Sequence, residues 1–154
     1  MIRNILDQVA GAISSTQARE DGESREEAIR MATAVLMVDV ARADHVFDES
    51  EFESVLELIE SHFNISPEAA VEIFNEANEE AEDLTSLHEF TQLLHSNLDE
   101  SEKSRIVALL WRIAYADGRL DKYEDSLVLK ISDLLHVSRG RVMRLKHDAE
   151  TTAG

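Results

Sequence analysis

The stretch "AYADGRLDKYE", Ala114 to Glu124, decides the fold, because the chain carries its pattern twice. Ala41 to Glu51 read "ARADHVFDESE" and place three carboxylates at the same spacing. These six acids are Asp44, Asp48 and Glu51 in the first stretch and Asp117, Asp121 and Glu124 in the second. An apolar run of helical period precedes and follows the acids both times, a pattern typical of a helix–turn–helix joint.

The repeat extends beyond the joints at a constant offset of 73 positions. Leu36 then matches Leu109, and Ala43 matches Ala116. A sequence that repeats itself at a fixed period indicates a repeated structural unit. We therefore expect two three-helix units, about residues 28–80 and 101–150, packed around one core with approximate two-fold symmetry.

Apolar residues recur at three- and four-residue steps along the chain, without sustained alternation, so we predict a single all-α domain of seven to eight helices. Residues 1–24 would form an amphipathic helix and a polar linker, and residues 25–154 the helical domain. Ser24 with Glu27 and Asp99 with Glu102 have the capping-box spacing that begins a helix. The predicted helices span about 2–13, 25–43, 49–63, 67–83, 87–97, 100–116, 122–136 and 139–150.

Composition limits the functional classes. The chain has 154 residues, no cysteine, and 32 acidic against 15 basic residues, for a net charge of −17. Such a surface repels nucleic acid and attracts cations and basic partners. No apolar run reaches the roughly 20 residues that span a bilayer, and the amino terminus lacks a secretory h-region. We expect a cytoplasmic protein without membrane insertion, and no enzyme, because no nucleophile elbow or phosphate-binding glycine loop is present.

The joint acids have two interpretations, which the sequence leaves open. Asp48 and Asp121 have the position of helix N-caps, with Glu51 and Glu124 completing capping boxes. Asp44 and Asp117 instead follow helix C-termini, where the helix dipole disfavours an anion. Clusters of carboxylates suit hard cations, so the six acids are a candidate Ca²⁺ or Mg²⁺ site. The other interpretation is that all six are structural.

Two charged faces are candidate partner-binding surfaces. Glu72, Glu76, Glu79 and Asp83 step by four, three and four residues along one helix face, whereas Val71 and Phe74 should face the core. The counterpart helix of the second unit carries Arg139, Arg141, Arg144 and Lys146 instead. Most charged stripes only solvate a helix. The opposite signs in the two units favour partner binding here.

Histidine and tryptophan positions suggest structural roles. His62 and His136 end their helices, where a partial positive charge is favourable. His88 and His95 lie seven residues apart and could form a two-histidine site, although surface histidines are the commoner case. Trp111, at helical spacing with Val107, should lie in the core.

The joint pattern A-x-A-D-G-x-L-D-x-x-E, carried twice and closely matched at Ala114–Glu124, resembles the TerB family of tellurite-resistance proteins. The same domain is similar to the amino-terminal region of the DjlA co-chaperones. The resemblance implies an all-helical duplicated domain with a divalent-cation site near the joints. It also implies a cytoplasmic stress-response protein whose protein partners include membrane-associated ones. A DjlA-like interaction domain without metal is the alternative.

Overall fold

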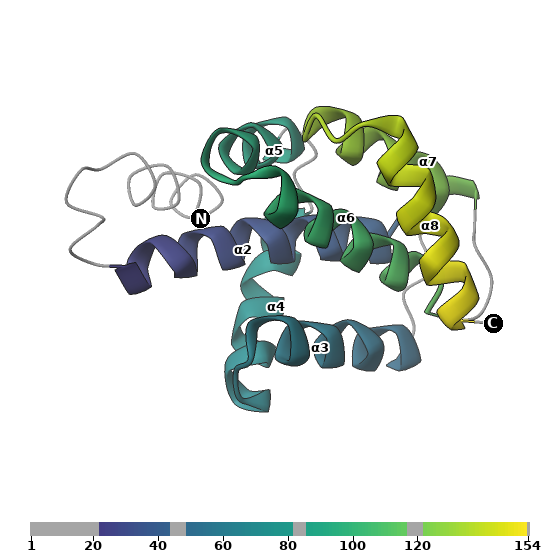
Figure 1. Ribbon diagram of the computed structural model, residues 1–154. Helices are drawn as coiled ribbons and strands as arrows, with labels where there is room; N and C mark the ends of the chain where they lie inside the picture. Colours follow the sequence, from purple (N-terminus) through teal and green to yellow (C-terminus); the bar gives the residue numbers. More distant parts are fainter. Residues whose placement is uncertain (1–21, 44–48, 82–85, 117–121, 154) are drawn as a thin grey trace.

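The computed structural model describes residues 22–43, 49–81, 86–116 and 122–153 (Figure 1). Within these ranges the chain forms helices and no strand, so the all-α prediction is confirmed. The predicted first helix, about residues 2–13, lies outside the described residues. The helices are α2 (Gly22–Ala41), α3 (Glu49–Phe63), α4 (Pro67–Ala81), α5 (Ser86–Asn97), α6 (Glu100–Ala114), α7 (Lys122–Leu134) and α8 (Arg139–Ala153).

Local sequence signals account for the starts of α4, α6 and α8, where the capping residues are described. Before α6, the backbone N–H of Glu102 donates to Asp99 Oδ1 at 2.8 Å, and the N–H of Asp99 donates to Glu102 Oε1 at 3.0 Å. This is the predicted capping box, which satisfies two N–H groups that the first helical turn leaves without partners. Ser66 caps α4 through the N–H of Ala69 at 3.1 Å.

The predicted start of α2 is wrong. The helix begins at Gly22, so Ser24 lies inside it and is not its N-cap. The residues that follow Gly22 include three glutamates, which favour the positive end of the helix dipole, so the helix extends into the polar segment. At its other end α2 stops at Ala41, two residues before the predicted boundary.

Helix α2 is the centre of the core. Every residue from Ala32 to Val38 is buried, on all sides of the helix. Such a helix must be surrounded by other elements. Figure 1 shows α2 running through the middle of the molecule, with α6 beside it, and α2 contacts α3, α4, α5, α6 and α7. Thr33 is accommodated because its hydroxyl donates to the carbonyl of Ile29 at 2.8 Å.

The two predicted units share several local structures. Asn64 after α3 and His136 after α7 adopt positive φ angles of 55° and 61°. The next N–H in each case donates to the carbonyl five residues earlier, Ile65 to Glu60 at 3.2 Å and Val137 to Ser132 at 3.1 Å. This is the Schellman ending of a helix.

Element contacts are also matched between the units. Contacts of α2 with α4, of α3 with α4 and of α2 with α3 correspond to those of α6 with α8, of α7 with α8 and of α6 with α7. Helix α5 falls between the two units. Superposition of the units about a two-fold axis stays a prediction.

Trp111 lies in the core, as predicted. It is fully buried, and its indole N–H donates to the carbonyl of Val142 at 3.2 Å. The bond ties α6 to α8 and satisfies the polar edge of an otherwise apolar ring. The Lys146 ammonium lies 5.3 Å from the centre of the same ring, within cation–π range.

Candidate functional site

The structure leaves the predicted cation site untested. Asp44, Asp48, Asp117 and Asp121 lie outside the described residues. Glu51 belongs to α3, but its side chain is also outside the described part of the chain. Where side chains are described, no group of three or more histidine, aspartate or glutamate residues could hold a metal ion.

Glu124 is the one joint acid whose side chain is described. It lies in the first turn of α7 and is 5% exposed. Acids are rarely buried to this extent unless another group compensates the charge. Its position in the first turn, near the positive end of the helix dipole, provides part of that compensation.

The acidic face of α4 is exposed where it is described. Glu72, Glu76 and Glu79 reach solvent, and Asp83 lies outside the described residues. Phe74 is buried as predicted, but the prediction for Val71 is wrong, because 38% of it is exposed. Helix α4 packs on α2 and α3 along a stripe that contains Ala70, Phe74 and Ala77, and Val71 lies beside that stripe. The acidic face therefore includes an apolar residue at its edge.

The basic residues of α8 divide into two kinds. Arg139 pairs with Asp133 at 3.2 Å, and Lys146 pairs with Asp125 at 2.7 Å, both acids coming from α7. Arg141 Nη1 donates to the Ser104 hydroxyl of α6 at 3.4 Å, so its charge stays uncompensated by that contact.

Arg144 is exposed. None of the ion pairs found among the described residues includes it. Half of the predicted basic surface is thus neutralised within the chain. Neither Arg141 nor Arg144 takes part in an ion pair found among the described residues.

A second basic surface, which the sequence analysis missed, lies on α6. Arg105 and Arg112 are exposed, and the charges of both act on His62 at the end of α3. Partial burial, and then these two guanidinium groups, lower the pKa of His62 below its ordinary value. His62 does lie in the last turn of α3, as predicted, but burial and the two arginines oppose a positive charge there. Its favourable interaction with the helix dipole stays a prediction. The signal in the sequence was two arginines seven residues apart on one helix.

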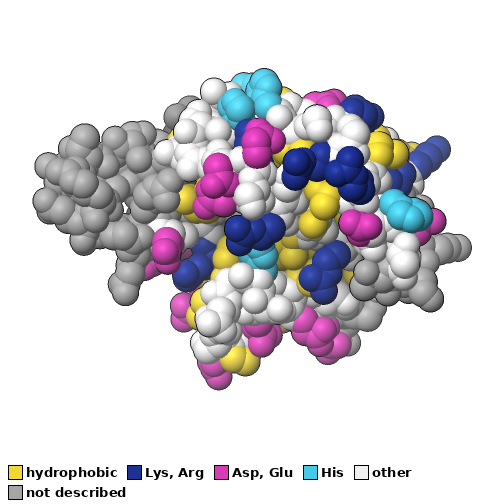
Figure 2. Space-filling view, in the orientation of Figure 1, with side chains coloured by type: hydrophobic (Ala, Val, Ile, Leu, Met, Phe, Trp, Pro, Cys, Tyr) yellow, Lys and Arg dark blue, Asp and Glu magenta, His cyan; other side chains and the backbone are white. Residues whose placement is uncertain are grey.

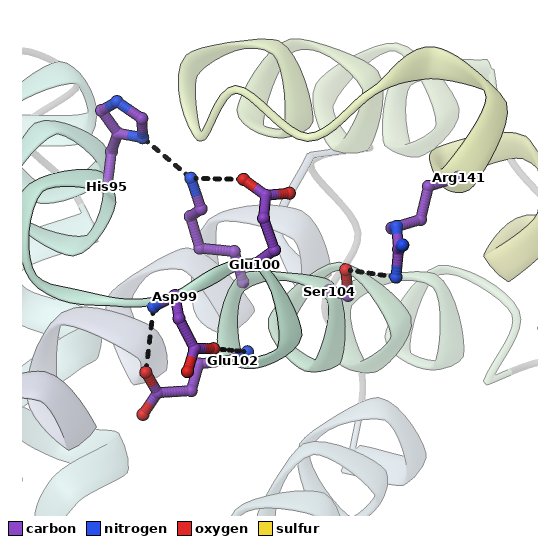
Figure 3. Close-up of polar contacts among 7 residues, drawn as sticks. His95, Asp99, Glu100, Glu102, Ser104 and Arg141 are labelled. Atoms are coloured by element: carbon purple, nitrogen blue, oxygen red, sulfur yellow. Dashed lines mark hydrogen bonds and ion pairs between the residues drawn. The ribbon is translucent and has the colours of Figure 1, made fainter.

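A polar cluster joins the end of α5 to the start of α6 (Figure 3), and His136, which follows α7, packs against it. Lys103 is 3% exposed, and its Nζ lies 3.0 Å from Nδ1 of His95 and 3.2 Å from Oε1 of Glu100. The rings of His95 and His136 are 4.1 Å apart, centre to centre. His88 is exposed and has no part in this cluster.

The cluster is unsuited to a metal. An ammonium group only donates hydrogen bonds, so Nδ1 of His95 accepts from Lys103, and the proton of the neutral ring lies on Nε2. A metal at Nε2 would have to displace that proton and break the bond to Lys103. The cluster is therefore a structural contact between three helices.

Asp39 has a raised pKa, which the sequence did not lead us to expect. Burial raises its pKa from 3.8 to about 7, and the nearby Arg42 offsets part of that rise. Arg42 itself donates to the side-chain oxygen of Asn78 at 2.9 Å and so ties α2 to α4. The signal was an aspartate inside the apolar run "AVLMVDVA" of α2.

None of the helices that the structure describes is long and apolar enough to cross a membrane. The fold and surfaces define an acidic all-helical module with separate acidic and basic faces. The family described as "Tellurite resistance protein TerB" matches residues 30–147, so the chain belongs to the TerB family. The TerB domain is an all-helical module that is not known as catalytic. Neither the curated proteins nor the solved structures include a match to the chain.

Proposed function

We propose that the chain is a non-catalytic binding or scaffold module of a tellurite-resistance-type stress response, and that a divalent cation at its two joints modulates its stability. The family match supports the tellurite-resistance class. The observation that carries the binding role is the separation of charge. Glu72, Glu76 and Glu79 stand exposed on α4, whereas Arg141 and Arg144 stand exposed on α8.

Opposite charges on the equivalent helices are not needed for packing. Helices α4 and α8 start with matched serine caps, Ser66 and Ser138, and pack on α2 and α6 in the same way. Exposed charges contribute little to stability, so their segregation serves recognition, in which complementary potentials select partners. The partners are proteins, membrane-associated ones included.

The cation role is supported by Glu124. Its burial places a carboxylate inside the protein at the second joint, close in sequence to Asp117 and Asp121. Carboxylates that lie close together repel one another, and a bound cation would relieve that repulsion. Ca²⁺ and Mg²⁺ are the hard ions that oxygen donors select. The alternative proposal is a DjlA-like interaction domain whose joint acids only cap helices.

Melting curves in chelator and in millimolar Ca²⁺ or Mg²⁺ distinguish these proposals. If a cation binds, wild type should be stabilised by the metal, and Asp117→Asn and Asp44→Asn should lose that stabilisation. Without metal the same variants should be as stable as wild type or slightly more so, because an unfavourable charge is removed. Glu76→Gln is the matched control, since it removes one negative charge from the exposed face of α4.

The DjlA-like alternative predicts a different result. A loss of about 1–3 kcal/mol in both joint variants, equal with and without metal, means that the acids anchor the turns through hydrogen bonds. That result removes the cation from the proposed function and leaves the binding role.

A further inference from the structure

Arg105 and Arg112 form the centre of an unusual surface in this acidic protein. They lie seven residues apart on α6, which places them on one face at a separation of about 10 Å along the helix. Helix α3 packs against α6, and its His62 experiences the charge of both arginines. None of the ion pairs found among the described residues involves either guanidinium group.

Two further arginines border this centre. Arg141 of α8 contacts Ser104, the neighbour of Arg105, at 3.4 Å. The Arg30 guanidinium lies 5.7 Å from the ring centre of Phe63, the neighbour of His62 in α3. We call Arg30, Arg105, Arg112 and Arg141, together with His62, the arginine face.

Figure 2 shows Lys and Arg side chains gathered across the middle of one side of the molecule, with a histidine and apolar side chains between them. Acidic side chains on the same side lie mainly around this region. A positive surface is therefore enclosed by a negative one, and the chain as a whole carries −17.

We propose that the arginine face binds a short acidic peptide segment of a protein partner. The proposal rests on the proposed binding function and gives it a second surface, distinct from the acidic face of α4. Guanidinium groups match carboxylates with two parallel hydrogen bonds, which suits arginine better than lysine to this role. The apolar atoms between the arginines would cover the aliphatic stems of acidic side chains.

The size of the face favours a peptide over other anions. The two arginine positions are about 10 Å apart along the helix, a spacing that suits two carboxylates of one extended segment better than one phosphate ion. A long nucleic acid would extend past the face onto acidic surface, where its phosphates would be repelled. A second copy of this chain could offer its acidic α4 face, but its net charge opposes association.

The test titrates the full chain with a ten-residue glutamate peptide at low salt and follows NMR signals of the arginine side chains and of His62. Arg105→Glu/Arg112→Glu should weaken binding at least tenfold. Lys122→Glu/Lys130→Glu is the matched control, because it changes net charge equally at two exposed positions of α7. It should weaken binding several-fold less.

His62 provides an independent measurement. Bound carboxylates offset the field of Arg105 and Arg112, so the peptide should raise the His62 pKa toward its ordinary value. A His62 titration that the bound peptide leaves unchanged would place the peptide elsewhere and overturn the proposal.

Four other results would also overturn it. These are no binding at millimolar peptide, equal loss in both double variants, tighter binding of a ten-residue oligothymidylate, or the same shifts with inorganic phosphate at equal concentration. A concentration-dependent dimer that Arg105→Glu/Arg112→Glu abolishes would instead assign the face to a second copy. The peptide titration can fail independently of the test of the proposed function. The metal-dependent melting curves depend on Asp44 and Asp117, and the peptide titration does not depend on either residue.

Discussion

Asn64 and His136 adopt the same left-handed backbone conformation, with φ angles of 55° and 61°, at equivalent helix ends of the two predicted units. Both positions are ones where glycine is the residue of least strain. The side chains differ in surroundings. Both residues are exposed, but the His136 ring also packs against His95, with ring centres 4.1 Å apart.

Glycine substitution at these two positions should therefore have different effects. Asn64→Gly should leave stability unchanged or raise it by up to about 1 kcal/mol, because backbone strain is relieved. His136→Gly should relieve the same backbone strain but lose the contact with the His95 ring. It should therefore raise the free energy of unfolding less than Asn64→Gly does. Urea unfolding of both variants measures the difference. Equal gains in the two would mean that the His95–His136 contact contributes nothing.

Asp39→Asn should stabilise the protein at alkaline pH and have no effect below about pH 4. Because burial raises the pKa of Asp39 to about 7, the folded protein holds a proton that the unfolded chain loses above 3.8. Wild-type stability should therefore decrease as the pH rises from about 4 to 7, and the asparagine removes that decrease. Melting temperatures from pH 4 to 8 measure it, with Glu76→Gln as the control for net charge. A difference independent of pH would contradict the assignment.

Lys103→Met should destabilise the protein by about 1–3 kcal/mol, because Nδ1 of the half-buried His95 loses its donor. Glu100→Gln should cost less than about 1 kcal/mol, since the Glu100 side chain is 63% exposed and its ion pair is screened. A double-mutant cycle of Lys103→Met with His95→Phe isolates the contact. A coupling energy near zero would mean that Lys103 acts through packing alone.

Asp99→Ala should cost about 0.5–2 kcal/mol, because it removes the cap of α6 and leaves the N–H of Glu102 without its acceptor. Ser101→Ala, at an exposed position of the same turn, is the matched control and should change stability by less than about 0.5 kcal/mol. Chemical denaturation of both variants measures the contrast. Similar losses in the two would show that the helix start tolerates a missing cap.

The sequence alone determined the helices and the family. The apolar periodicity and caps such as Asp99 with Glu102 place α6 and most other helices within a few residues of their structural bounds, because these signals act between neighbours in the chain. The repeated joint indicated the TerB class for the same reason, since its pattern is contiguous. The start of α2 was missed because Ser24 and Glu27 have the capping-box spacing, whereas the helix begins two residues earlier, at Gly22.

Only the tertiary structure decided which charged side chains are paired within the chain and which are not. Arg139 and Lys146 belong to a sequence segment with several bases and no acid. In the folded chain, however, each of the two pairs with an aspartate of α7. Arg105 is brought near His62 because α3 packs on α6, and Asp39 is buried because α2 is covered on all sides. Charge interactions and desolvation depend on distance in space and on exclusion of water, and packing between distant segments sets both.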